Sequence, residues 1–262
     1  MSRLVVVTAT TNLERARPCI ESWGDVEKVV VPNGGSSAYL GTVPAFRLGV
    51  DAALQQYPDA EVIACLHDDL ELQDPQWVQK VLDRFDRQPA IGLLGFGGAI
   101  GLGADEIYKT AYQPVQLARK GFRSNLVDAE VHGLRSLLPE RVACLDGFSQ
   151  IGRRAFWEGW GFQRHRPDGI ATVDYRPWHV LQDLGLIHHI YDSALGLLAA
   201  RYGWETWYLP IRCKHWGGQT AVGDAGYQAW AKQQVEGGDH GFWEQGHRAV
   251  YDAFVDTLPL RV

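Results

Sequence analysis

The sequence predicts an α/β fold with a mostly parallel, Rossmann-like central sheet flanked by helices. Short apolar runs rich in β-branched residues alternate with segments of helical periodicity over about the first hundred residues. This β-α-β-α-β-α-β order favours parallel strands joined by right-handed crossovers. The chain has 262 residues, of which 46% are hydrophobic and 21% charged, enough to bury a sizeable core.

Each element of the first half follows from a local pattern. Continuous apolar runs predict strands over 4–7, 26–31, 62–66 and 91–96. Prolines near helix starts and apolar residues at helical spacing predict the helices between them. The first helix lies around Pro18, the second runs from about Pro44 to Tyr57, and the third runs from Asp74 to Phe85. We expect Asp74 to cap the third helix.

The second half is less regular. We expect a long excursion over 97–140 and no clear period over 163–182. Apolar runs predict strands over 142–145 and 204–209, and a helix begins near 153–158. A further helix over 190–202 ends at Gly203, and the tail from about 226 is helical.

Composition excludes several classes of protein. The net charge of −6 gives no bulk attraction for nucleic acid. None of the four cysteines forms a CxxC pair, so we expect buried free thiols in a reducing compartment. The N-terminal apolar run is too short for a signal peptide, and no segment is long enough to span a bilayer. We therefore expect a cytoplasmic protein without a membrane span.

Three polar segments follow expected strands, where ligands bind in open α/β sheets: Thr8-Ala9-Thr10, Asn33-Gly34 and His67-Asp68-Asp69. Neither of the usual phosphate-binding loops, GxGxxG and GxxxxGK[ST], occurs, so another group must neutralise the charge of a bound phosphate. Adjacent carboxylates repel each other unless a cation or hydrogen-bond donors lie nearby. Mg²⁺ or Mn²⁺ bound by Asp68 or Asp69 together with phosphate oxygens fits this pattern. A solvent-exposed capped turn is the alternative.

The order of these segments resembles family 2 glycosyltransferases of the GT-A fold. In the first half, 5–10, 29–36 and 62–71 correspond to the family's nucleotide-binding strand ends and acidic motif. In the second half, Asp146-Gly147 resembles the acceptor-side segment, and Tyr191-Asp192 occupies the place of the acidic pair that holds the base.

The resemblance implies a domain organisation and a reaction. Residues 1–225 would form the GT-A domain, with a nucleotide-sugar half at 1–100 and an acceptor half at 101–225. Residues 226–262 would form a C-terminal helical extension. The implied activity is metal-dependent transfer of a sugar from a nucleoside-diphosphate sugar to an acceptor hydroxyl, with inversion.

The resemblance also assigns roles to residues. Asp69 and His215 would bind Mn²⁺ or Mg²⁺, and Asp192 would be the general base. The donor-binding residues would be Thr8, Ala9, Thr10, Asn33, Gly34, Arg47, His67 and Asp68. The chain departs from the family pattern at His67 and Tyr191, where acids are usual, and at Arg47, where Asn is common.

Other interpretations stay open at this point. The acceptor could be a saccharide, a lipid-linked intermediate, a small molecule, a protein or a modified nucleic-acid base. A nucleotidyltransferase would usually carry a Gly-rich basic loop after the first strand, which 8–17 lacks. A non-catalytic sugar-binding module could use the ten tryptophans but would not need these acids.

Single residues also have alternative roles. Asp192 could instead stabilise a helix N-terminus, and His215 could be an ordinary core histidine. We interpret His188-His189 as structural, or acceptor-side at best, because adjacent helical residues point apart.

Overall fold

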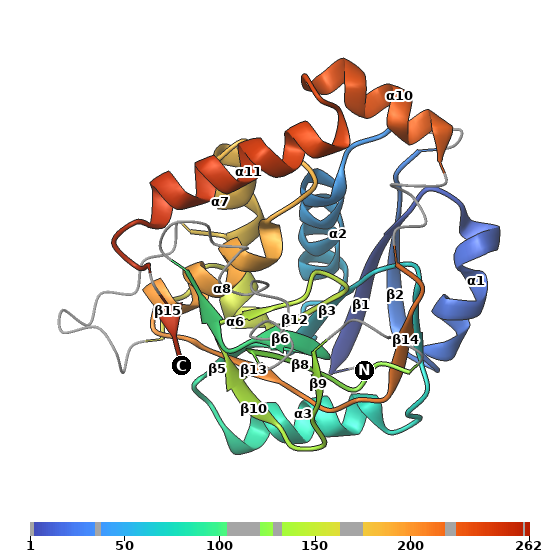
Figure 1. The fold of residues 1–262 in the computed structure, drawn as a ribbon. Coiled ribbons are helices and arrows are strands. Elements are labelled where there is room, and N and C mark those ends of the chain that lie inside the picture. The colour runs from blue at the N-terminus through green and yellow to red at the C-terminus, as the bar shows by residue number, and fades with distance from the viewer. Residues whose placement is uncertain are drawn as a thin grey trace.

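The computed structural model has a mixed seven-stranded sheet at its centre, with helices on both faces (Figure 1). The structure describes residues 3–34, 38–103, 121–127, 133–162, 175–217, 224–258 and 260–262. The sheet consists of β1 (Leu4–Thr10), β2 (Glu27–Pro32), β3 (Val62–Leu66), β5 (Ile91–Gly95), β10 (Glu140–Val142), β12 (Ser149–Arg153) and β13 (Glu205–Tyr208). Its spatial order is β10-β13-β5-β12-β3-β1-β2.

Helices and short strands complete the architecture. The helices are α1 (Leu13–Ser22), α2 (Thr42–Gln56), α3 (Trp77–Arg87), α6 (Arg154–Trp157), α7 (Pro177–Asp183), α8 (Tyr191–Arg201), α10 (Ala225–Gln234) and α11 (Asp239–Phe254). The short strands are β4 (Leu70–Leu72), β6 (Gly97–Ala99), β7 (Gly101–Leu102), β8 (Phe122–Ser124), β9 (Leu134–Arg135), β11 (Cys144–Leu145), β14 (Cys213–His215) and β15 (Leu260–Arg261). None of the described helices combines the length and apolarity needed to cross a bilayer.

The two faces of the sheet are covered by different helices, and β1 shows how. Val5 and Val7 belong to the larger core, which includes α2, α7 and α8. Leu4 and Val6 belong to a second core with α3. Strand side chains alternate between faces, so a run that is apolar at every position marks a strand buried on both sides. This confirms the α/β fold and the expected strands of the first half.

The directions of the strands are as expected, but the sheet is mixed. β1 pairs in parallel with β2 and β3. β12 lies between β3 and β5 and is antiparallel to both, so those two strands run in the same direction without pairing. β13 then adds in parallel to β5. The expected strand over 142–145 is divided: Glu140–Val142 forms the sheet edge as β10, and Cys144–Leu145 pairs with β6 in a second sheet.

β12 is absent from the sequence prediction because its sequence, SQIGR, is not an apolar run. Ser149 and Gln150 are completely buried, and each makes a side-chain hydrogen bond, although Gln150 Oε1 has no partner among the described residues. The Ser149 hydroxyl accepts the Phe96 N–H at 2.8 Å, and Gln150 donates to the Asp146 carbonyl at 3.1 Å. Buried polar groups are tolerated when hydrogen-bonded, which hides this strand from a hydropathy pattern.

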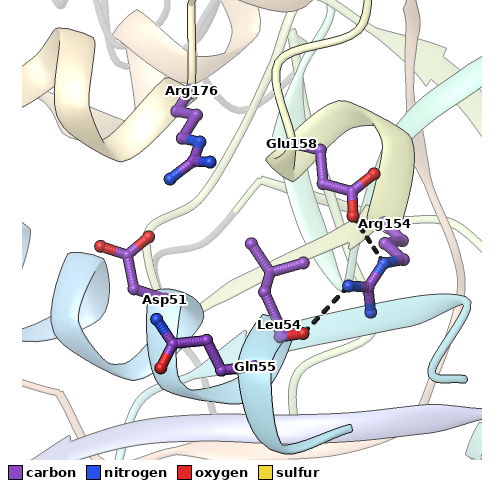
Figure 2. Close-up of a pocket in the computed structure, with 6 residues that line it drawn as sticks. All are labelled: Asp51, Leu54, Gln55, Arg154, Glu158 and Arg176. Atoms are coloured by element: carbon purple, nitrogen blue, oxygen red, sulfur yellow. Dashed lines mark hydrogen bonds and ion pairs between the residues drawn. The ribbon is translucent and has the colours of Figure 1, made fainter. Parts of the chain in front are cut away.

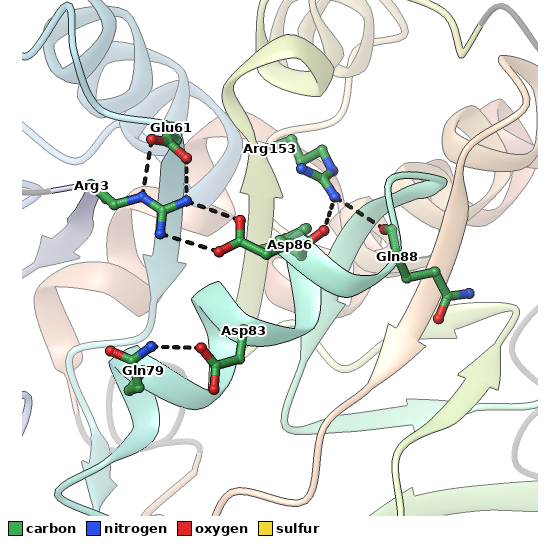
Figure 3. A network of polar contacts seen from close by, with 8 residues as sticks. Arg3, Glu61, Gln79, Asp83, Asp86, Gln88 and Arg153 are labelled. Atoms are coloured by element: carbon green, nitrogen blue, oxygen red, sulfur yellow. Dashed lines mark hydrogen bonds and ion pairs between the residues drawn. The ribbon is translucent and has the colours of Figure 1, made fainter.

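Arginines tie the strand ends to the neighbouring helix (Figure 3). Arg3 forms paired contacts with Glu61 and Asp86, the shortest being 2.6 and 2.9 Å. Arg153, at the end of β12, donates to the Ile91 carbonyl at 2.6 Å and also reaches the last turn of α3. The Arg3 contacts are exposed, so we assign them little stability; the partly buried Arg153 fixes β12 against β5 and α3.

Candidate functional site

The candidate site forms where β3 ends. Leu66 is the last residue of the strand, and the His67 N–H donates to the Phe148 carbonyl at 3.0 Å. The chain then turns through Asp68 and Asp69 into β4. This turn places three consecutive polar side chains at the carboxyl end of a central strand, as the sequence predicted.

Pairing between β14 and β4 brings His215 to this turn. His215 lies opposite Leu70 in the antiparallel register, and the Trp216 N–H donates to the Asp69 carbonyl at 3.1 Å. The Asp69 Oδ1 and His215 Nε2 atoms are 3.1 Å apart, with only 15% and 14% of their side chains exposed. The two residues assigned to the metal by resemblance therefore lie side by side.

His67 completes a three-residue group with Asp69 and His215. One potential ligand atom from each lies within 4.8 Å of the others, a grouping able to hold a metal ion. Aromatic rings enclose the group: Phe46 stacks on His67 at 6.3 Å, and Phe148 lies 4.8 Å from His215 between ring centroids. His67, predicted above to bind the donor, thus also belongs to this potential metal group, which the sequence pattern does not indicate.

Tyr191 determines which nitrogen of His67 faces the group. The Tyr191 hydroxyl donates its single proton to the Gly147 carbonyl at 3.1 Å, and it lies 2.7 Å from His67 Nε2. If that proton lies toward Gly147, Nε2 of His67 is the donor and Nδ1 presents its lone pair 3.9 Å from Asp69 Oδ1. A Cβ on Gly147 would overlap this hydroxyl, so the glycine is required for the contact.

The donor atoms of the group fit a bound cation. Asp69 Oδ1 and His215 Nε2 are buried and have no partner of hydrogen-bond geometry in the part of the chain described. A lone pair on His67 facing a carboxylate is repulsive unless a cation lies between them. Burial lowers the pKa of His67 to about 4, which keeps its ring neutral, the form that binds metals.

The pKa values of Asp69, His215 and Asp68 are shifted from their ordinary values. Burial alone would raise the pKa of Asp69, but the neighbouring His215 and His67 outweigh it and hold that pKa below its ordinary value. Burial opposes protonation of His215, but the contact with Asp69 outweighs it and raises the pKa of His215. The pKa of Asp68 is raised by burial, and Asp68 Oδ2 is a buried acceptor without a partner among described residues.

A second acid lies at the start of α8. Asp192 is half-buried, and its Oδ1 accepts the Ser193 N–H at 2.8 Å. Burial, together with the nearby charge of Asp146, raises the pKa of Asp192 to about 7. Asp146 also acts electrostatically on His67 and His215, so it lies near the histidine group as well as near Asp192. A carboxylate with a pKa near 7 is suited to accept and release protons at neutral pH.

The predicted donor-binding residues near β1 and β2 are only partly accessible. The Asn33 N–H donates to the Thr10 carbonyl at 2.8 Å, so these two strand ends lie side by side, as expected. Thr8 is completely buried inside the sheet, whereas Ala9 is partly exposed. The Asn33 side chain already accepts the Leu40 N–H at 2.7 Å.

Gly34 and Arg47, which were also predicted to bind the donor, have surroundings that suit a role in the scaffold. Gly34 has a φ of +126°, and a Cβ there would overlap Tyr39, so only glycine fits. Arg47 donates to Gln182 at 2.7 Å and lies 3.8 Å from Asp51, which places it in the contact between α2 and α7.

A separate pocket of about 320 Å³ lies between α2, α6 and the start of α7 and contains none of the predicted site residues (Figure 2). Arg154 on its wall is held by Glu158 at 2.6 Å and by the carbonyls of Leu54 and Tyr57 at 3.0 Å. The main charged group of this pocket is thus part of the scaffold.

Comparison with solved structures gives distant likenesses. No protein-family model matches the chain, and no curated protein matches it. The solved structure of A197 from STIV aligns with a TM-score of 0.46 and 13% identity over 82% of this chain and 86% of that one. A glycosyltransferase involved in the glycosylation of the major capsid of PBCV-1 aligns with a TM-score of 0.30 and 11% identity, over 58% and 59%. Both TM-scores lie below 0.5, so neither likeness assigns a family or an activity to this chain.

Proposed function

We propose that this protein is a metal-dependent glycosyltransferase that moves a sugar from a nucleoside-diphosphate sugar to an acceptor hydroxyl. The observation that carries the proposal is the His67, Asp69 and His215 group at the end of a central strand. Asp192 follows Tyr191, whose hydroxyl contacts His67, and Asp146 acts electrostatically on both the group and Asp192. The three residues of the group would hold Mn²⁺ or Mg²⁺ together with phosphate oxygens of the donor, which supply the oxygen ligands that these ions prefer. The ion would neutralise charge on the diphosphate leaving group. The order of these residues along the chain resembles the GT-A pattern described above, with His67 as a departure from it.

The chain's own residues would then have distinct tasks. Asp68, with its unpaired buried oxygen, would accept a hydrogen bond from the donor, for which a ribose hydroxyl is suitable. Ala9, Thr10 and Asn33, at adjoining strand ends, would line the nucleoside. Asp192 would accept the proton of the acceptor hydroxyl as its oxygen bonds to the anomeric carbon. The electron pair of the broken sugar–oxygen bond leaves with the diphosphate.

A thermal-shift screen with UDP- and GDP-sugars, with and without Mn²⁺, tests the proposed function. A donor present at 100 times its Kd should add about 2.7 kcal/mol to the free energy of unfolding. For a chain of this size that corresponds to roughly 5 to 10 °C in Tm. A rise that needs both the donor and Mn²⁺ supports the proposal. A screen in which every rise is independent of the metal contradicts it.

Tyr191→Phe tests how His67 is oriented. The substitution removes the hydroxyl that contacts His67 Nε2 but keeps the buried ring, which packs 5.7 Å from Trp178. Losing a hydrogen bond that orients a metal ligand typically costs 10- to 100-fold in affinity, and we expect Mn²⁺ binding to weaken by about that factor. Calorimetric titration with Mn²⁺ measures it, with exposed Tyr251→Phe as the control. Equal affinities of Tyr191→Phe and the unmodified protein would remove Tyr191 from this role.

A further inference from the structure

His188 and His189 lie outside the proposed catalytic group, yet the structure gathers them with an acid from the C-terminal helix. One potential ligand atom from each of His188, His189 and Asp239 lies within 4.8 Å of the others. His189 Nε2 is 2.9 Å from Asp239 Oδ1, and the two imidazole rings are 4.6 Å apart between centroids. Asp239 is the first residue of α11, so two distant segments of the chain meet here.

The expectation that adjacent histidines point apart fails because these two are not helical. They lie in the turn between α7 and α8 and are followed by Ile190, with a φ of +65°. Ile190 is the one non-glycine residue with positive φ in the described part of the chain, and a β-branched residue rarely adopts this conformation. Gly246 of α11 packs against Ile190, where a Cβ would lie only 3.2 Å from its side chain. The turn is thus held in shape by α11.

His188 and Asp239 each contact a hydroxyl group outside the cluster, as metal ligands commonly do. His188 Nδ1 lies 2.8 Å from the Thr42 hydroxyl at the start of α2. Asp239 Oδ1 accepts the Tyr227 hydroxyl of α10 at 2.6 Å. Such partners fix the ring and carboxylate orientations of ligating residues.

We propose that His188, His189 and Asp239 form a second metal site that binds Zn²⁺ or a similar borderline cation. Two imidazoles and one carboxylate suit zinc, whereas Mg²⁺ and Ca²⁺ prefer ligand sets made of oxygen. Zinc–nitrogen and zinc–oxygen bonds are about 2.0 to 2.2 Å long, so ligand atoms that lie within 4.8 Å of one another would move closer together around an ion. The ion ties α11 to the turn before α8, which begins one residue before Asp192. This site does not depend on the proposed sugar transfer.

Zn²⁺ titration of chelator-treated protein by calorimetry, paired with Tm measurements, tests the site. His188→Gln is the decisive variant because it leaves the His189–Asp239 contact in place. Asp69→Ala removes a ligand of the first group, so zinc that still binds this variant reports on the second. We expect Asp69→Ala to bind one Zn²⁺ with a Tm rise of about 5 °C at saturating metal. The Asp69→Ala/His188→Gln protein should lose this rise and at least about tenfold in affinity.

His240→Ala, in the Asp69→Ala background, is the matched control, since His240 is adjacent to Asp239 but has 72% of its side chain exposed. It should bind zinc as the Asp69→Ala protein does. An Asp69→Ala protein that binds no Zn²⁺ would overturn the proposal. So would unchanged zinc affinity and Tm rise after His188→Gln, which would leave His189 and Asp239 as a simple ion pair.

Discussion

Asp192→Asn is expected to lower sugar transfer by roughly a hundredfold or more while leaving donor affinity unchanged, as for the loss of a positioned general base. The substitution keeps the shape of the side chain and an oxygen able to accept the Ser193 N–H. Asp192 lies in the first turn of α8 and the N-cap residue is Ile190, so α8 should keep its start. Turnover with acceptor present and donor Kd, measured on the same preparation, separate the two effects.

The pH dependence of kcat/KM is an independent test of Asp192 as the general base. With a pKa of about 7, Asp192 is protonated and inactive as a base below that pH, so kcat/KM should rise through about pH 7 and then level off. The group also affects stability, because its folded pKa lies above the ordinary 3.8. The folded state binds more protons between these two values, so this group's contribution to stability falls as pH rises from about 4 to 7. Asp192→Asn should remove both dependences.

Exposed Asp252→Asn on α11 is the control for removing one negative charge. It should leave turnover and its pH profile unchanged. Near-normal turnover of Asp192→Asn with acceptor present would instead show that Asp192 only stabilises the N-terminus of α8.

Asp69→Ala is expected to abolish metal-dependent donor binding, with a loss of at least about a hundredfold in affinity. Asp69 is the only carboxylate of its group, and its Oδ1 lies within 3.1 Å of His215 and 3.9 Å of His67. Removing it leaves two neutral imidazoles, a poor ligand set for Mn²⁺ or Mg²⁺, which favour carboxylate oxygens. Donor titration at fixed Mn²⁺, with and without EDTA, measures the loss.

The fold should survive this change because Asp69 Oδ1 has no hydrogen-bond partner among described residues. Nearby Glu71→Gln, on β4 and only two residues along the chain, is the matched control and should bind donor normally. If Asp69→Ala retained Mn²⁺-dependent donor affinity, the metal assignment would be wrong.

The strands that lead to the site could be predicted because they are continuous apolar runs. β3 shows this best: five buried residues stop at the polar turn His67–Asp69, so the position of the acids follows directly from the sequence. The hydropathy pattern does not indicate β12, because its buried residues Ser149 and Gln150 are polar and are stabilised by hydrogen bonds. That strand also converts the expected parallel array into a mixed sheet.

The composition of the histidine group could not be predicted from local patterns. His215 reaches Asp69 through a three-residue pairing of β14 with β4, too short to leave a periodic signal. The orientation of His67 depends on the Tyr191 hydroxyl and on the absence of a side chain at Gly147, both distant in sequence. His188 and His189 converge because of the unusual backbone of Ile190, which no propensity scale indicates.

Release of nucleoside diphosphate from a nucleotide sugar is the most direct measure of the proposed activity. UDP- and GDP-sugars, incubated with the protein and Mn²⁺, should yield free nucleoside diphosphate from at least one donor. The yield should rise with a suitable acceptor and fall to background with EDTA or in Asp69→Ala. Release that is equal in Asp69→Ala, or unaffected by EDTA, would contradict a metal-dependent glycosyltransferase built on His67, Asp69 and His215.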